Sequence, residues 1–267
     1  MADAERLIFT GESGGFKLTW TTKDVVVRPA QASSRIVFSA KSMAEQEFKN
    51  DTMVEEGEAP PDCEAGRQFT LLSVVGPLIS YLDEATMSCR GAAHAMHSVS
   101  FRTLNLSEPD PDGISSSGLK QMRLDNLFTE ADLLRGFLAE PIIKKTIEGA
   151  GMPPPRTLRN LDEQFLSSGI LDVNSGVGFV ALEPMSNFAF HHLDQNSVAI
   201  RICITPTSGP ERGSFSQLGI LLPTPQGLKQ SLRQADSRQA GFLMKDYKNV
   251  SGNQTTRIDF TSGDVST

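Results

Sequence analysis

The chain has 267 residues, a hydrophobic fraction of 39% and a formal net charge of −7 at pH 7. This length is enough to bury a sizeable core, and no stretch reaches the roughly 18 uncharged apolar residues that a membrane-spanning helix needs. Acidic residues outnumber basic ones, 32 to 25, and no dense basic stripe is present to attract phosphates. The composition therefore predicts a globular protein without a membrane span that does not bind nucleic acid.

The first segment has the pattern of a β-strand. Phe16, Leu18 and Trp20 alternate with polar residues, which is the period of a half-buried strand, and residues 25–27 are consecutive valines. We expect a small β-rich region over residues 1–66.

An acidic segment follows at residues 43–64, around Pro60 and Pro61. It shows neither a helical nor a strand period, so it is interpreted as a loop or insertion. A solvated surface segment is the simpler interpretation, and a docking site for a basic partner is the alternative. The segment also marks the boundary with a larger domain over residues 67–247.

The centre of the chain is rich in β-forming residues. Residues 68–81 and 95–106 are expected to be strands that together form a hairpin. Gly76 and Pro77 interrupt the first stretch and predict a bulge or a sheet edge, because proline cannot donate a hydrogen bond to a neighbouring strand. Residues 110–118 predict a mobile loop.

Helix signals come next. Thr129 precedes two acidic residues and a helical apolar period, and Pro141 is expected to split that helix in two. A short helix follows around Leu158, Leu161 and Phe165. Strands are then predicted at residues 178–182, 188–192, 198–204 and 217–222, with a turn at 194–196. A last helix begins after Thr224 and Pro225, and the polar residues 248–267 are expected to fray.

The three cysteines allow at most one internal disulfide. Cys203 lies in an apolar strand and is expected in the core, whereas Cys63 can pair with Cys89 in an oxidising compartment. None of them has the spacing of a zinc site, and we predict no metal or cofactor. The first six residues lack the features of a signal peptide, which leaves a cytoplasmic protein or a removed signal as alternatives.

The four histidines are the candidates for acid–base or metal chemistry. Because neighbouring side chains on a strand point to opposite faces, His191 and His192 should diverge. His192 shares a face with two phenylalanines, which favours a core histidine over a ligand. His94 follows the small residues 91–93 and Arg90, and small residues let another chain or a sugar approach closely. Arg90 and His94 are therefore candidate ligand contacts.

Four segments carry a family resemblance. They are FTLLSVVGP at 69–77, GAAH at 91–94, FRTLNL at 101–106 and MRLDNLF at 122–128. Together they resemble the bacterial domain of unknown function that forms the extracytoplasmic C-terminal part of lysozyme-sensing anti-sigma-V factors. The similarity covers roughly residues 68–244, and Ala92 stands where the family usually has a second glycine.

The resemblance implies an α+β fold, in which a few helices pack on one face of an antiparallel sheet that a small β-rich region precedes. It also implies a non-catalytic binding module of the periplasm or cell surface, which recognises a muramidase-like protein or a peptidoglycan-derived ligand. Tyr81, Arg90 and His94 are its expected contacts, and the acidic segment 43–64 would attract a basic partner. One alternative is a hydrolase of wall polymer that uses His94 and His192, with or without a metal; another is a scaffold or immunity-type protein.

Overall fold

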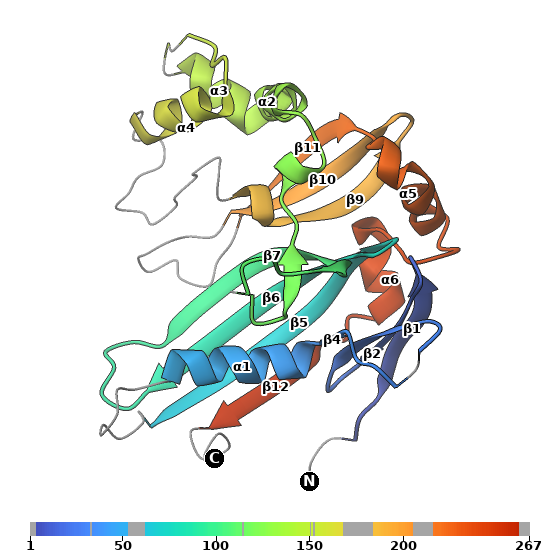
Figure 1. Ribbon diagram of the computed structural model, residues 1–267. Helices are drawn as coiled ribbons and strands as arrows, with labels where there is room; N and C mark the ends of the chain where they lie inside the picture. Colours follow the sequence, from blue (N-terminus) through green and yellow to red (C-terminus); the bar gives the residue numbers. More distant parts are fainter. Residues whose placement is uncertain are drawn as a thin grey trace.

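The computed structural model describes residues 4–32, 34–52, 62–113, 115–149, 151, 153–167, 184–204 and 216–261. Within these residues, twelve strands form three sheets, every strand pair is antiparallel, and six α-helices accompany them (Figure 1). The predicted α+β class with antiparallel sheets is confirmed.

The N-terminal residues form a four-stranded sheet in the order β1-β2-β3-β4. Its strands are β1 (Leu7–Ser13), β2 (Phe16–Thr21), β3 (Val25–Pro29) and β4 (Phe38–Ser39). Leu18, Trp20, Val25 and Val27 are buried, which confirms the strand pattern expected there.

A five-stranded central sheet has the order β12-β5-β6-β7-β8. Its strands are β5 (Cys63–Val75), β6 (Leu78–Cys89), β7 (Met96–Pro109), β8 (Leu119–Gln121) and β12 (Thr256–Thr261). The bulge or edge expected at Gly76 and Pro77 is wrong, because these two residues form the tight turn between β5 and β6. Gly76 has a φ of 56°, a conformation that suits glycine in a short turn.

The loop expected at residues 43–64 is wrong for residues 43–52, which belong to helix α1 (Ala40–Thr52), and for Cys63 and Glu64, which begin β5. Its buried face consists of Ala40, Met43, Ala44 and Phe48, which recur at helical spacing. The two alanines complete this face, and without them the apolar period is invisible. Residues 53–61 lie outside the described residues. α1 lies across one face of the central sheet (Figure 1).

The frayed tail expected at residues 248–267 is wrong for residues 248–261, because helix α6 (Tyr247–Ser251) and β12 lie there and β12 pairs with β5. Residues 262–267 lie outside the described residues. Thr256, Ile258 and Phe260 are buried in alternation with exposed neighbours, which is the pattern of a half-buried strand. The domain boundaries expected after residues 66 and 247 therefore fall inside β5 and at the start of α6, not between elements.

The third sheet has the order β11-β10-β9, from β9 (Phe188–Asp194), β10 (Ser197–Ile204) and β11 (Ser216–Pro223). Three helices cover one face, namely α2 (Glu130–Ala139), α3 (Pro141–Gly149) and α4 (Leu158–Ser167), and the central sheet lies against the other (Figure 1). Pro141 splits the helix as expected, and the Thr129 hydroxyl accepts a hydrogen bond from the Asp132 amide at 3.2 Å. The strand expected at 178–182 lies outside the described residues.

The last predicted helix is α5 (Lys229–Asp236). A short 3₁₀ turn (Gln226–Leu228) precedes it, so Pro225 caps that turn instead of opening the α-helix. Within the described part of the chain, no helix is long and apolar enough to cross a membrane.

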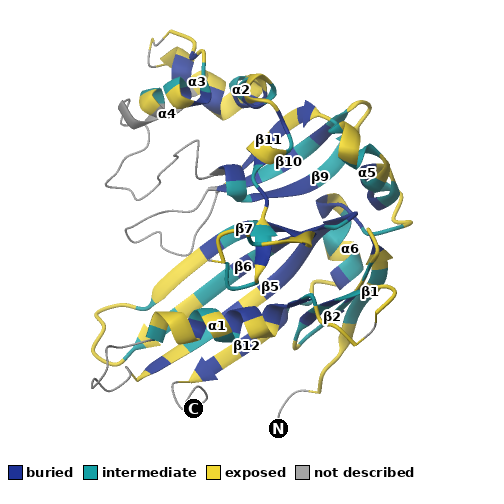
Figure 2. Cartoon of the chain, in the orientation of Figure 1, coloured by how far each residue is buried: buried dark blue, intermediate teal, exposed yellow. Residues whose placement is uncertain are grey.

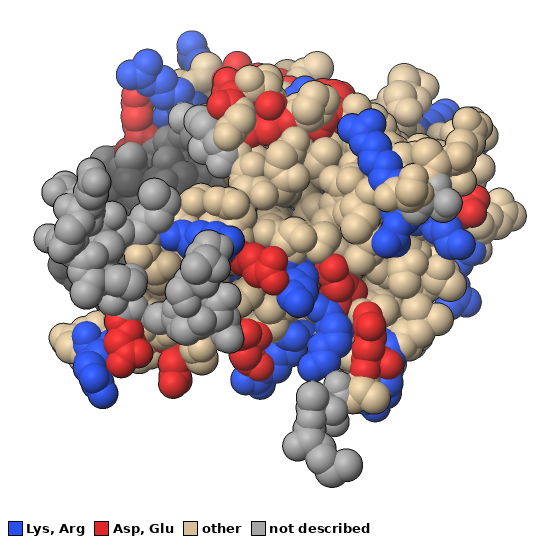
Figure 3. All heavy atoms as spheres, turned by 60° about the horizontal axis from the view of Figure 1, so that its bottom comes forward, with Lys and Arg blue, Asp and Glu red and all other residues tan. Residues whose placement is uncertain are grey.

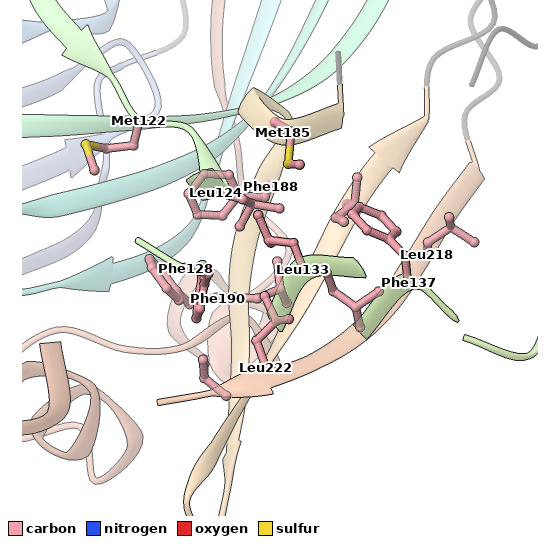
Figure 4. Close-up of a cluster of buried hydrophobic side chains, with 14 of the residues drawn as sticks. Met122, Leu124, Phe128, Leu133, Phe137, Met185, Phe188, Phe190, Leu218 and Leu222 are labelled. Carbon is pink, nitrogen blue, oxygen red and sulfur yellow. The ribbon is translucent and has the colours of Figure 1, made fainter. Parts of the chain in front are cut away.

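Two large apolar clusters and a small one form the core. The first lies between the helices α2 to α4 and the third sheet, and Figure 4 shows its part around α2; the second joins α1, the N-terminal sheet and the central sheet. The small cluster, which includes Leu72, Phe101 and Cys203, connects the central and third sheets. Figure 2 shows that β6 and β7 are buried near the third sheet and largely exposed at the turn that joins them.

Candidate functional site

A pocket of about 250 Å³ lies between α1 and the exposed end of the central sheet. In the strand register, Ala65 on β5 is opposite Met87 on β6, and Met87 is opposite Met96 on β7. These three side chains form the floor of the pocket. The small side chain of Ala65 leaves space there, and the flexible side chains of Met87 and Met96 lie beside that space. The last turns of α1 supply one wall through Phe48 and Asp51.

A stacked aromatic pair closes another side of this pocket. The rings of Phe48, on α1, and Phe260, on β12, have centroids 5.3 Å apart and planes inclined by 12°. Both side chains are buried, whereas Met96 is 55% exposed. The pocket is therefore apolar inside and open at the β7 side.

A network of four buried or half-buried charges adjoins the pocket through Arg67, which lines it. Arg67 donates to Asp83 through Nε at 2.7 Å and through Nη2 at 2.5 Å, and its Nη1 forms an ion pair with Glu47. Arg102 contacts the same two carboxylates, with Nη1 at 2.9 Å from Glu47 and Nε at 3.1 Å from Asp83. Ser116 also donates to Glu47. The network holds α1 to three consecutive strands of the sheet.

The opposite charges in this network stabilise one another. Burial alone would raise the pKa of Glu47, but Arg102 and Arg67 outweigh burial and lower it below its ordinary value. Burial would lower the pKa of Arg67, but the contacts with Asp83 and Glu47 raise it. The carboxylate of Glu47 and the guanidinium of Arg67 therefore stay ionised, and all three nitrogens of Arg67 are engaged within the protein.

The sequence contained a signal for this network that the strand predictions missed. Arg67, Asp83 and Arg102 stand at positions of apolar strands that face α1 instead of solvent. Charged residues at such positions are expected to pair with one another, because an isolated charge is costly to bury. Glu47 was missed because the helix that carries it was interpreted as a loop.

The three predicted contact residues do not come together. Tyr81 is 1% exposed, its hydroxyl donates to the Met43 sulfur at 3.4 Å, and burial raises its pKa. Arg90 and His94 are exposed in the turn between β6 and β7, where Arg90 lies 3.6 Å from Asp62. Nine residues of extended chain place Arg90 roughly 30 Å from Tyr81. A ligand contact at Arg90 and His94 stays a prediction, whereas Tyr81 has almost no surface to offer.

Cys63 and Cys89 form a disulfide, and Cys203 is buried in the core, as expected. The two bonded cysteines stand directly opposite each other on β5 and β6. On the same face, the next pair of residues along the strands is Ala65 and Met87. The disulfide therefore fixes the strand ends that form the pocket floor.

His191 and His192 do not diverge, which corrects the expectation from strand alternation. The register of β9 against β10 shifts here, so that Ala199 faces His192 while Ile200 faces Phe190. This bulge leaves His191 without an opposite residue and places the two Nδ1 atoms 2.7 Å apart. Burial, Arg201, His192 and Lys245 lower the pKa of His191 to about 4.

The hydrolase alternative requires His94 to lie beside His192. In the structure, the imidazole that contacts His192 is that of His191. Among the described residues, no group of three or more His, Cys, Asp or Glu side chains is placed to hold a metal ion.

Figure 3 shows basic and acidic side chains interspersed on one face of the molecule. The net charge of −7 is therefore not gathered into one broad acidic area on that face. On that face, attraction to a charged partner would act through local groups.

Comparison of the chain with family models, with curated proteins and with solved structures found no match.

Proposed function

We propose that the chain is a non-catalytic binding module of the cell envelope that holds its ligand in the pocket beneath α1. The observation that carries this proposal is the open apolar pocket itself, in which Met96 is 55% exposed on the floor. Arg67, which lines the pocket, is paired with Asp83 and Glu47, and most of the other lining side chains are apolar, which supports binding through apolar contact.

The disulfide supports a location outside the cytoplasm. Disulfides persist in oxidising compartments, and reducing compartments keep most cysteines as thiols. Because the Cys63–Cys89 bond joins the strands that form the pocket floor, oxidation keeps that end of the sheet together.

The size of the pocket favours a protein ligand. Pockets for whole small molecules begin at roughly 300 Å³, whereas one side chain of a partner protein fits a smaller space. Side chains that insert into such pockets commonly dominate the affinity of a protein interface. The resemblance of residues 68–244 to anti-sigma-V domains makes a c-type lysozyme the first ligand to test, and soluble peptidoglycan fragments the second.

The test measures the affinity of lysozyme and of soluble peptidoglycan fragments for wild type, Met96→Ser and Ile142→Ser, with one binding partner immobilised on a surface. Ile142 on α3 is the matched control, because it is an exposed apolar side chain, 63% accessible, that does not line the pocket. We expect saturable binding that Met96→Ser weakens about tenfold, as loss of a central interface contact does, and that Ile142→Ser leaves unchanged. Failure of both ligands to bind, or equal affinities of the two variants, would contradict the proposal.

A His94→Ala variant in the same assay tests the β6–β7 turn separately. Weaker binding would extend the contact surface from the pocket to this turn. Unchanged binding would confine it to the pocket and remove His94 from the predicted contacts.

A further inference from the structure

We infer that the pocket receives a lysine or arginine side chain of a basic partner protein, with the cation at Asp51. This inference rests on the proposed function, because it names the chemical group that enters the same pocket. It follows from the charge at the mouth of the pocket, from the apolar walls and from the engagement of Arg67.

The mouth of the pocket is negative. Asp51 lines the pocket, is exposed, and stands in the last turn of α1. In the described part of the chain, no hydrogen bond or ion pair engages its carboxylate. A cation at this position therefore meets the carboxylate of Asp51.

The walls fit the long apolar stem of a basic side chain. Lysine and arginine bury their methylene groups against apolar surface while the charged head stays near water. Met87 and Met96 offer polarisable, adaptable contacts to such a stem. The stacked rings of Phe48 and Phe260 add aromatic surface, which attracts cations as well as methylene groups.

The permanently cationic side chain that lines this pocket is already engaged within the protein. Among the described residues that line this pocket, Arg67 is the only lysine or arginine, and its nitrogens already engage Asp83 and Glu47. An incoming carboxylate would find no free donor on Arg67 and would meet the negative charge of Asp51. The pocket therefore selects a basic side chain over an acidic one.

The probes are N-acetyl-lysine amide and N-acetyl-norleucine amide, which differ in the terminal ammonium group. They are titrated into wild type, Asp51→Asn and Asp125→Asn, with the methyl resonances of Met87 and Met96 followed by NMR. Asp125 is the control, because it is an acidic residue outside the pocket that is paired with Arg123 at 3.0 Å. We expect both methyl groups to shift, with lysine amide binding about two- to fivefold more tightly, the ratio that one exposed ion pair supplies.

Asp51→Asn should abolish this preference, and Asp125→Asn should keep it. The inference is overturned if norleucine amide binds as tightly as lysine amide in wild type, if Asp51→Asn retains the preference, or if neither methyl group shifts. Its failure is separable from that of the proposed function. Lysozyme binding that Met96→Ser weakens, without a lysine preference, would keep the binding module and give the pocket a neutral occupant. A lysine preference without binding of lysozyme or peptidoglycan would keep the basic occupant of the pocket and contradict the proposed ligands.

Discussion

The guanidinium of Arg67, on β5, grips the carboxylate of Asp83, on β6, through two hydrogen bonds of 2.7 and 2.5 Å. Their side chains are only 9% and 3% exposed. A two-point contact of this kind fixes the orientation of both groups as well as their distance. Because Glu47 of α1 completes the network, this pair determines where the helix that walls the pocket lies.

Asp83→Asn should destabilise the protein strongly. The change keeps the shape of the side chain but leaves two guanidinium groups, those of Arg67 and Arg102, facing Glu47 alone. Removing one partner from a buried ion pair costs about 3–5 kcal/mol, because the other charge stays buried without compensation. Urea unfolding of Asp83→Asn and of wild type measures this difference.

Asp125→Asn is the matched control for Asp83→Asn. Asp125 also pairs with an arginine, Arg123, but its side chain is 43% exposed. An exposed ion pair contributes about 1 kcal/mol or less, so this variant should unfold close to wild type. Equal losses of stability in the two variants would show that burial does not determine the strength of the Asp83 contacts.

His191 should make the protein less stable as the pH falls. Its pKa is about 4 in the folded protein against an ordinary 6.5, with burial as the main cause and Arg201, His192 and Lys245 as further ones. Between pH 6.5 and 4 the unfolded chain binds a proton that the folded protein excludes. The contribution of His191 to stability is therefore complete above pH 6.5, decreases towards pH 4 and changes little below that.

The measurement is the free energy of unfolding at pH 7 and pH 5 for wild type and His191→Gln. The variant should lose less stability over this interval than wild type does. His94→Gln, which removes an exposed histidine of the β6–β7 turn, controls for the loss of an imidazole. An identical pH dependence in wild type and His191→Gln would contradict the assignment.

Local patterns in the sequence predicted the elements whose apolar period is complete. β2, β10 and the cap of α2 at Thr129 were found in this way, because alternation and capping depend on near neighbours only. α1 was missed because alanines complete its buried face, and β12 because its short alternation lies in a polar tail. Both elements are held by partners distant in the sequence, which no local pattern reveals.

The candidate site was predicted only in part. The cysteine pair and the β6–β7 turn were identified, and both lie beside the pocket floor. The pocket itself depends on strand register and on the position of α1, neither of which the sequence pattern contained. The adjacent histidines show the same limit, because one bulge in β9 reverses the direction expected for His191.

Gly14 and Gly15 form the turn between β1 and β2, yet only Gly14 should resist substitution. Both have positive φ, 58° and 83°. A Cβ on Gly14 would lie 2.3 Å from the carbonyl carbon of Gly76, in the turn between β5 and β6, whereas a Cβ on Gly15 meets nothing within 4 Å. The two hairpin turns thus touch at Gly14.

Gly15→Ala should cost about 1 kcal/mol, from the left-handed backbone conformation alone. Gly14→Ala should cost about 1–3 kcal/mol more, because the two turns must move apart. Thermal unfolding of the two variants isolates the contact, since the conformational cost is shared. Equal losses would mean that the turns separate freely.

The hydroxyl of Thr256, on β12, attaches this strand to the N-terminal sheet, and a substitution that removes only the hydroxyl tests the attachment. Trp20 donates from Nε1 to the Thr256 Oγ1 at 3.0 Å, and that hydroxyl donates to the Thr21 carbonyl at 2.6 Å. Thr256→Val keeps the shape but leaves the buried indole N–H without its acceptor, which costs about 1–3 kcal/mol. Thr256→Ser retains the hydroxyl and should lose less stability.

Trp20 is the only tryptophan of the chain, so its fluorescence reports unfolding directly in all three proteins. If valine proves as well tolerated as serine, the hydrogen bond does not hold the N-terminal sheet to β12, and apolar packing around Trp20 accounts for the attachment.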